Sequence, residues 1–229
     1  MDSILKVKHF YITFGPETVI HDISFEVKER ETLVILGPNG AGKTVLLKAL
    51  LGLLPYLGEV IWRKGVKIGY VPQRVPFEKD LPLTIEEFFG LKGISREKTA
   101  QVLKQVGIED EKFLKKQIGI ISSGQFQRVL IAWALVDNPN VLLFDEPTAG
   151  IDIGGEETVY NLIQRTQKER ELTIFLVTHD LTTVFNQATN VLCLNKNRFC
   201  YGTPKEILTP ENLQDVFGGK IKYFLHTHE

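Results

Sequence analysis

The stretch LVILGPNGAGKTVLLKALLG, residues 33–52, decides what kind of fold this sequence can form. It opens on the apolar run 33–36, which is typical of a buried strand. A glycine-rich loop follows, and apolar residues at helical spacing then predict a helix over roughly 43–51. A strand, a glycine-rich loop and a helix in this order predict an α/β unit that binds the phosphates of a nucleotide.

The loop matches the pattern G-x-x-x-x-G-K-[ST]. Its residues are Gly37, Pro38, Asn39, Gly40, Ala41, Gly42, Lys43 and Thr44. Glycines let successive backbone N–H groups point inward at phosphate oxygens, and the following helix adds the positive end of its dipole. We expect Lys43 to reach the β- and γ-phosphates of ATP and the hydroxyl of Thr44 to ligate Mg²⁺. A glycine-rich turn that matches by chance is the alternative, and the flanking strand and helix argue against it.

Composition excludes several classes of protein. The chain has 229 residues, 43% hydrophobic and 24% charged, so it can bury a sizeable core. A formal net charge of -1 gives no basic excess, so nucleic acid is not an expected partner. No apolar run reaches the ~20 residues of a membrane-spanning helix, and Met1–Lys8 lacks the apolar core of a signal peptide. We therefore expect a cytoplasmic protein that reaches a membrane only through a partner.

The order of the predicted elements indicates a mostly parallel α/β core that a helical segment interrupts. The predicted strands are 4–14, 19–28, 58–63, 67–71, 141–144, 172–177 and 191–194. The predicted helices are a short one opened by a capping box at Thr84 and three more over 95–106, 125–136 and 156–168. We expect a single domain over 1–229, whose core is formed by 1–73 and 139–229 and whose helical subdomain is 74–138.

The run VLLFDEP, residues 141–147, ends an apolar strand on two acids. In open α/β sheets ligands bind at the carboxyl ends of the strands. Asp145 is therefore expected to hold Mg²⁺ through its water shell, and Glu146 to polarise an attacking water. A solvated loop after a strand is the plainer alternative, which the phosphate-binding loop elsewhere in the chain disfavours.

With these two motifs the sequence resembles the ATP-binding cassette family, the ATPase subunits of ABC transporters, over nearly its whole length. Four further segments carry the resemblance: YVPQ at 70–73, ISSGQFQR at 121–128, GID at 150–152 and VTHD at 177–180. The resemblance implies a P-loop NTPase (RecA-like) core, an N-terminal antiparallel β subdomain and an inserted helical subdomain.

The resemblance also assigns roles to single residues. Gln73 would ligate and sense Mg²⁺ and the attacking water, and His179 would contact the γ-phosphate, so that both join Glu146 in catalysis. Phe14 stands where the family keeps an aromatic ring on adenine, and Tyr11 is the competing ring. The plainer alternatives are a turn residue for Gln73, a surface histidine for His179 and a core aromatic for Phe14.

The family signature is usually LSGGQ, and Ser123 replaces its first glycine here. By resemblance, Ser122, Ser123, Gly124 and Gln125 serve the nucleotide of the opposite subunit, because two chains sandwich two ATP molecules head to tail. Asp152, in the segment that resembles the family's D-loop, is also expected to bind nucleotide. We expect the signature to precede a helix that begins at Gln125, so that its N–H groups and the helix dipole face a phosphate. Ser123 either is tolerated and adds a donor, or crowds the phosphate and weakens closure.

The resemblance implies integral-membrane permease subunits as partners, a position at the cytoplasmic face of the membrane and, for an importer, an external solute-binding protein. Phe77, Leu81, Phe88 and Phe89 would flank a cleft after Gln73 that receives a cytoplasmic helix of the permease. Adjacent residues point about 100° apart on a helix. We therefore expect one of Phe88 and Phe89 to pack inside and the other to face the partner.

The substrate is indicated only indirectly. Segments 68–89 and 191–219 look like those of zinc- or manganese-type metal importers. His226, His228 and Glu229 could bind a transition metal weakly, and a frayed polar terminus is the plainer alternative. An importer of another small solute, such as a siderophore, stays open. A soluble ATPase that acts on nucleic acid or ribosomes is disfavoured by a single cassette, two cysteines and no heptad run.

The two cysteines lie in VLCLNKNRFCYG, which predicts two strands around a tight turn. If the turn has two residues, Asn195 opposes Arg198 and Cys193 opposes Cys200; a longer loop is the alternative. We expect two adjacent, reduced, structural thiols without a catalytic role.

Overall fold

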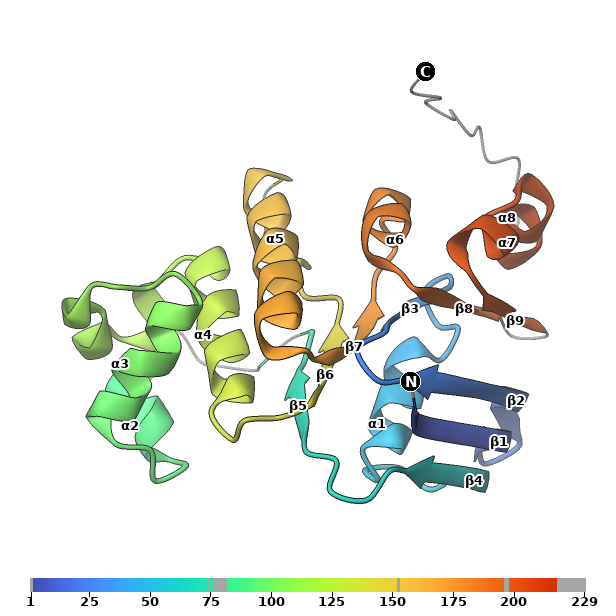
Figure 1. Ribbon diagram of the computed structural model, residues 1–229, viewed down its shortest axis with the longest axis horizontal. Helices are drawn as coiled ribbons and strands as arrows, with labels where there is room; N and C mark the ends of the chain where they lie inside the picture. Colours follow the sequence, from blue (N-terminus) through green and yellow to red (C-terminus); the bar gives the residue numbers. More distant parts are fainter. Residues whose placement is uncertain (1, 74, 76–81, 152, 196–197, 218–229) are drawn as a thin grey trace. The chain divides into compact units, whose positions relative to one another are not determined.

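A computed structural model describes residues 2–73, 75, 82–151, 153–195 and 198–217 of the chain (Figure 1). The chain divides into two compact units; the described residues of the first lie within 2–63 and 176–217, and those of the second lie within 64–175. The helical segment 74–138 belongs to the second unit. The division into a core and a helical subdomain at 73 and 139 stays a prediction.

The first unit contains an antiparallel sheet with the strand order β2-β1-β4. Its strands are β1 (Ser3–Phe14), β2 (Glu17–Lys28) and β4 (Leu57–Trp62). Burial in β1 and β2 alternates with exposure except where the register shifts, as expected for an irregular sheet with one face on a core. The indole N–H of Trp62 donates to the carbonyl of Leu50 at 3.0 Å, which ties β4 to helix α1 (Lys43–Leu50). The predicted N-terminal strands are confirmed.

The first unit also contains a parallel strand pair. Strand β3 (Thr32–Leu36) is buried at every position and pairs in parallel with β8 (Asn190–Asn195). Strand β9 (Arg198–Gly202) returns antiparallel to β8 and places Cys200 opposite Cys193, as predicted. The unit further contains α6 (Leu181–Gln187), α7 (Pro204–Ile207) and α8 (Pro210–Phe217), which the sequence patterns did not predict.

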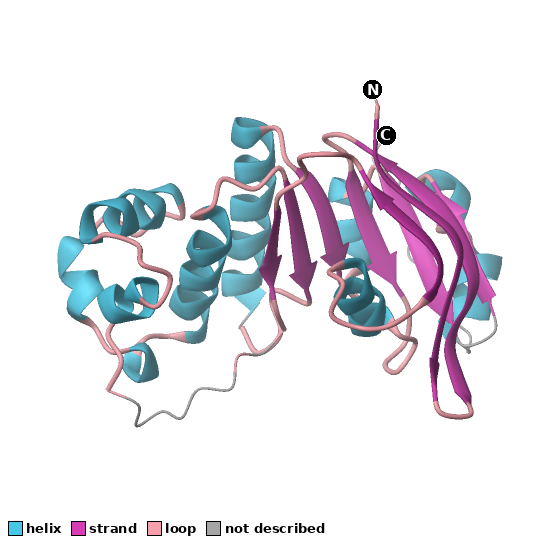
Figure 2. Cartoon of the chain, turned by 90° about the horizontal axis from the view of Figure 1, so that it is seen from below, coloured by secondary structure: helices cyan, strands magenta, loops and turns pink. Residues whose placement is uncertain are grey.

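The second unit combines a parallel strand pair with a group of helices. Strand β5 (Ile68–Val71) pairs in parallel with the fully buried β6 (Val141–Asp145), and β7 (Thr173–Val177) crosses the boundary between the units. The helices are α2 (Ile85–Gly90), α3 (Arg96–Gln105), η1 (Glu111–Lys115), η2 (Ile118–Ile120), α4 (Ser123–Leu135) and α5 (Ile153–Arg170). Figures 1 and 2 show α2, α3 and α4 packed side by side.

Local sequence signals explain where α2 and α3 begin. The hydroxyl of Thr84 accepts from the N–H of Glu87, whose carboxylate accepts from the N–H of Thr84, so the predicted capping box is confirmed. The backbone N–H of Thr84, and then its hydroxyl, donate to the carboxylate of Glu87 and lower the pKa of that carboxyl. Ser95 caps α3 as predicted. Across the described ranges, no helix combines the length and the apolar character needed to cross a membrane.

The expectation for Phe88 and Phe89 is wrong. Phe89 is fully buried and Phe88 is only 7% exposed, so neither ring is available to a partner. The reason is Trp133 on α4, which stacks on Phe88 at 4.2 Å between ring centroids and meets Phe89 edge-on at 5.5 Å. Lys92 lies over the indole at 4.7 Å and pairs with Asp137. Phe77 and Leu81 lie outside the described residues.

Candidate functional site

The glycine-rich loop holds a buried lysine among backbone carbonyls. Lys43 is 6% exposed, and its ammonium donates to the carbonyl oxygens of Gly37 at 2.9 Å and Pro38 at 3.1 Å. The loop is further closed by the N–H of Ala41, which donates to the Pro38 carbonyl at 3.2 Å. An ammonium forms its strongest hydrogen bonds with charged acceptors such as phosphate oxygens, so a lysine buried in this loop suits a phosphate.

The start of α1 also suits a phosphate. Its N-cap is Gly42, in the left-handed region at φ 93°, and no side chain caps the helix. The first N–H groups of such a helix have no intrahelical acceptor and carry partial positive charge. A Cβ at Gly42 would lie 2.9 Å from Val19, so backbone fits there where a side chain would not. The bare helix terminus is therefore open to a ligand.

The end of β6 offers a carboxylate suited to Mg²⁺. Asp145 is 1% exposed, and the phenol of Tyr70 on β5 donates to its Oδ2 at 3.3 Å. Burial, and then the charge of Asp145, raise the pKa of Tyr70 well above its ordinary value, which keeps the phenol a donor. Carboxylate, hydroxyl and amide oxygens are the hard ligands that Mg²⁺ prefers, so Asp145, Thr44 and Gln73 have the right chemistry. Tyr70 was missed from the sequence, although it stands in the YVPQ segment.

Glu146 follows directly in a strained backbone conformation. Its φ is 47°, which is uncommon for a residue other than glycine and is found at functional sites. Its Oε2 accepts from the amide Nε2 of Gln73 at 2.8 Å. The second unit therefore brings Gln73 and Glu146 into direct contact, beside the Tyr70–Asp145 pair.

Two further expected site residues, His179 and Phe14, lie in the first unit together with the glycine-rich loop. His179 is exposed and follows Thr178, whose N–H donates to the carbonyl of Ile35 at 3.4 Å, so it emerges at the end of β3 where the glycine-rich loop begins. Asp180 then caps α6. Phe14 ends β1 and is 45% exposed, so the alternative of a core aromatic is wrong and the ring is accessible for stacking.

The signature segment is placed differently from the expectation. Helix α4 begins at Ser123, and its N-cap is Ser122, so Ser123, Gly124 and Gln125 form its first turn. The physical reason is a capping box: the hydroxyl of Ser122 accepts from the N–H of Gln125, and the Gln125 side chain accepts from the N–H of Ser122, both at 3.2 Å. A helix that begins at Gln125 is therefore wrong. The first-turn N–H groups of Ser123 and Gly124 have no intrahelical acceptor.

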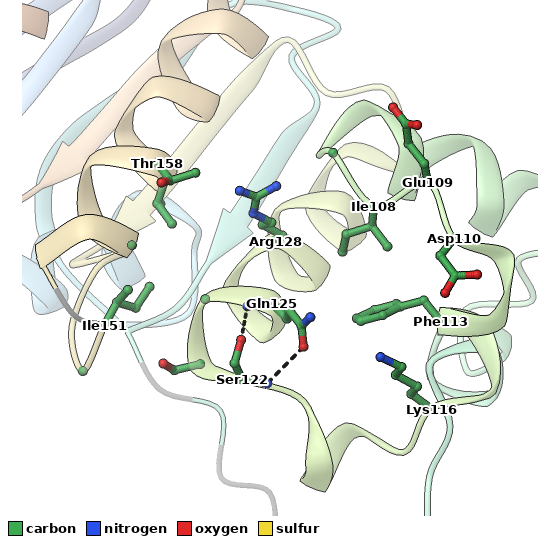
Figure 3. A pocket seen from close by; sticks show the side chains of 16 residues that line it. Ile108, Glu109, Asp110, Phe113, Lys116, Ser122, Gln125, Arg128, Ile151 and Thr158 are labelled. Carbon is green, nitrogen blue, oxygen red and sulfur yellow. Dashed lines mark hydrogen bonds between the residues drawn. The ribbon is translucent and has the colours of Figure 1, made fainter.

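A cavity of about 810 Å³ lies in front of this helix terminus (Figure 3). Ser122, Ser123, Gly124 and Gln125 form one side of it. Arg128, further along α4, also lines the cavity. The other sides are formed by the segment after α3, with Asp110, Phe113 and Lys116, and by the residues just before α5 and at its start, with Gly150 and Ile151. The structure thus brings the signature and the GID segment to one cavity, which spacing in the sequence did not predict. Asp152 lies outside the described residues.

Comparison with known proteins identifies the family. The family model described as ABC transporter matches residues 20–149. The chain belongs to the ABC transporter family. It is an ATPase of that family, with a mixed α/β P-loop fold that has parallel strand pairs and an antiparallel β subdomain.

Individual members of the ABC transporter family match along the whole chain. The chain is 35% identical to the zinc import ATP-binding protein of Wigglesworthia glossinidia brevipalpis, with 100% of both chains covered. It is 37% identical to that of Haemophilus influenzae, over 98% of this chain and 85% of the relative.

Two solved structures of ABC transporter proteins resemble the fold. An ABC transporter described as of metal-chelate type, in an inward-facing conformation, gives a TM-score of 0.84 at 26% identity, with 94% of this chain and 89% of that chain covered. The cbiO1 subunit of the cbiONQ complex of Clostridium perfringens gives 0.77 at 29% identity, with 94% of each chain covered.

Proposed function

We propose that this chain is the ATP-hydrolysing subunit of an importer for a divalent transition metal ion, with zinc as the first candidate. The observation that carries the proposal is similarity from end to end to zinc import ATP-binding proteins. The alignments span the helical segment as well as the nucleotide-binding motifs, since 94–100% of this chain is covered in the matches cited here and in a third from Jannaschia sp..

One group of residues in the proposed subunit binds ATP and Mg²⁺, and a second group acts on the attacking water and the γ-phosphate. Lys43 and the bare start of α1 bind the phosphates, and Phe14 stacks on the adenine. Mg²⁺, held by Thr44, Asp145 and Gln73, would neutralise the charge that develops on the leaving phosphate. Glu146 orients the attacking water and takes its proton, and His179 contacts the γ-phosphate.

The signature cavity of the second unit supports a dimer. The wall of this cavity at the start of α4 offers the first-turn N–H groups of Ser123 and Gly124, which suit an anion, and the cavity lining also includes Lys116 beside Glu109 and Asp110. We propose that this wall binds the nucleotide of a second copy, head to tail, and that hydrolysis opens the dimer. The opening drives integral-membrane permease subunits, at the cytoplasmic face of the membrane, that receive the metal from an external binding protein.

A metal chelate is the second candidate substrate. The observation in its favour is the fold similarity to a transporter described as of metal-chelate type. The two candidates differ in the solute that stimulates ATP hydrolysis, because a transporter couples its ATPase to the solute that it carries.

The test is co-purification from membranes with an integral-membrane partner, followed by ATPase assays of the complex with its binding protein. Stimulation by free Zn²⁺ supports the first candidate, and stimulation only by a chelate, such as a ferric siderophore, supports the second. A complex that responds to neither contradicts metal import. Purification without any membrane partner contradicts the transport role.

Glu146→Gln is the matched catalytic control. The amide keeps the size of the side chain but cannot take a proton, so hydrolysis should fall by about 10²–10⁴-fold while ATP binding persists. The variant should also elute as an ATP-bound dimer in size-exclusion chromatography. Turnover at the wild-type rate would remove Glu146 from the mechanism.

A further inference from the structure

Two free thiols face each other across the β8–β9 strand pair. Cys193 lies directly opposite Cys200 in the antiparallel register, and both cysteines are free. Opposed residues in such a pair have Cα atoms about 4.5–5.5 Å apart. A disulfide spans Cα separations of about 4.4–6.8 Å. The two thiols can therefore be joined without moving either strand far.

The two thiols differ in accessibility and in acidity. Cys193 is 1% exposed, whereas Cys200 is partly exposed. The hydrogen bond between the thiols lowers the pKa of Cys200 and raises that of Cys193, and burial raises the latter further. Because the thiolate is the reactive form, Cys200 suits the attacking role and Cys193 the resolving role.

Strand β8 is in direct backbone contact with the start of the glycine-rich loop. Cys193 pairs with Leu36, the last residue before the loop. The next carbonyl, that of Leu194, lies so close to Gly37 that a Cβ on this glycine would be 2.2 Å from its oxygen. No side chain separates the two backbones at this point. A small shift of β8 at Leu194 therefore displaces the backbone of Gly37 directly.

We propose that Cys193 and Cys200 form an oxidation site, at which hydrogen peroxide closes a reversible cross-strand disulfide that weakens ATP binding at the adjacent loop. The Cys200 thiolate attacks one peroxide oxygen, the O–O bond breaks, and the other oxygen takes a proton and leaves as water. The resulting sulfenic acid is attacked by the sulfur of Cys193, which loses its proton as a second water leaves and the S–S bond forms. One peroxide is reduced and two thiols are oxidised to a disulfide, which a thiol reductant reverses.

The weaker binding follows from the geometry. A covalent bond draws the sulfurs closer than hydrogen-bonded thiols lie; side-chain rotation takes up most of this change, because the Cα separation already suits a disulfide, and the small remainder shifts β8 at Cys193. The Leu194 carbonyl then moves relative to Gly37, and N–H groups of the loop lose alignment with phosphate. Loss of one such hydrogen bond costs about 1 kcal/mol, which is about fivefold in affinity.

The experiment compares the reduced and the peroxide-treated full chain. A tryptic digest without reductant detects the bridge, because Arg198 lies between the cysteines and cleavage there leaves two peptides joined only through sulfur. Calorimetry with ATP should show about fivefold weaker binding after oxidation, and dithiothreitol should restore it. Because oxidation and reduction are both carried out on the wild-type chain, its ATP affinities before and after dithiothreitol can contradict the proposal without any variant.

Cys200→Ser is the matched control, since serine keeps a hydrogen-bonding side chain on β9 but cannot bridge. It should bind ATP like the reduced wild type and not respond to peroxide. Three results overturn the proposal: both thiols stay free after treatment, the bridge joins two chains instead of one, or the bridge forms and ATP affinity does not change. A Cys200→Ser chain that loses affinity on oxidation overturns it as well.

Discussion

Two helix N-termini in this protein differ in the backbone conformation of the N-cap residue, which is left-handed at Gly42 and extended at Ser122, and in whether a side chain caps their N–H groups. At the loop corner, residues 37–44, α1 begins after Gly42 with no side-chain cap. At the signature corner, residues 121–125, α4 begins after Ser122 with a complete capping box. The first corner leaves its donors open, and the second closes part of its own helix terminus.

The difference indicates which of the two corners can bind a phosphate group without help from another part of the protein or from a second copy. The loop corner adds a buried ammonium to its bare N–H groups, which is enough charge for a polyphosphate. The signature corner keeps the N–H groups of Ser123 and Gly124 and no buried cation of its own among the described contacts. It therefore suits a phosphate that is already held from another side, as in the proposed dimer.

Lys43→Ala tests the open corner and should have the largest effect. The alanine removes charge-assisted hydrogen bonds to the phosphates, so ATP affinity should fall by about 4 kcal/mol, near a thousandfold. Isothermal calorimetry measures the loss, and circular dichroism checks that the variant is folded. Lys48→Ala, on the exposed side of the same helix, is the control and should bind normally. Equal binding by a folded Lys43→Ala chain would contradict the role.

A glycine-to-alanine pair tests the corners against each other. Gly42→Ala forces a side chain into a left-handed conformation 2.9 Å from Val19, and should destabilise the chain by about 3 kcal/mol. A Cβ at Gly124 meets nothing within 4 Å and lies in a helix, so Gly124→Ala should stabilise the chain by about 0.5–1 kcal/mol.

Urea denaturation measures both glycine variants. ATPase activity separates stability from function, because the Cβ at Gly124 would narrow the proposed approach of the second nucleotide. Gly124→Ala should therefore gain stability and lose turnover. If Gly124→Ala increased both stability and turnover, or if it destabilised the chain, the proposed difference between the two corners would be contradicted.

Features of this site that depend on neighbouring residues in the sequence can be predicted from it, whereas contacts between residues far apart in the chain cannot. The loop at 37–44 and the pairing of Cys193 with Cys200 were predicted because strand, turn and helix signals are local. The start of α4 was wrong although its signal is local: Ser122 and Gln125 have the spacing of a capping box. The buried state of Phe88 could not be predicted, because it depends on Trp133, a residue far along the chain.

Tyr70→Phe tests whether a hydrogen bond from Tyr70 holds the carboxylate of Asp145 in place, as backbone carbonyls hold the ammonium of Lys43 at the loop corner. The variant keeps the ring and removes the donor to Asp145, so the carboxylate loses one constraint. Apparent affinity for Mn²⁺ in the presence of ATP, measured by electron paramagnetic resonance, should weaken by about fivefold. ATP affinity in EDTA should not change. Tyr201→Phe, which removes a phenol that donates to the Glu26 carbonyl, is the control; the same Mn²⁺ affinity in both variants would contradict the role of Tyr70.

Ser122→Ala opens the closed corner and should have the smallest effect. The alanine cannot accept from the N–H of Gln125, and loss of an N-cap costs about 1 kcal/mol. For a chain of this length that corresponds to a melting temperature lower by about 2–4 °C. Thr84→Ala removes the same kind of cap from α2 and gives the matched stability loss. If the signature corner also binds phosphate through the Ser122 hydroxyl, Ser122→Ala should reduce ATP turnover where Thr84→Ala does not. Equal turnover in the two variants would limit Ser122 to capping and leave the proposed phosphate contact to the N–H groups of Ser123 and Gly124.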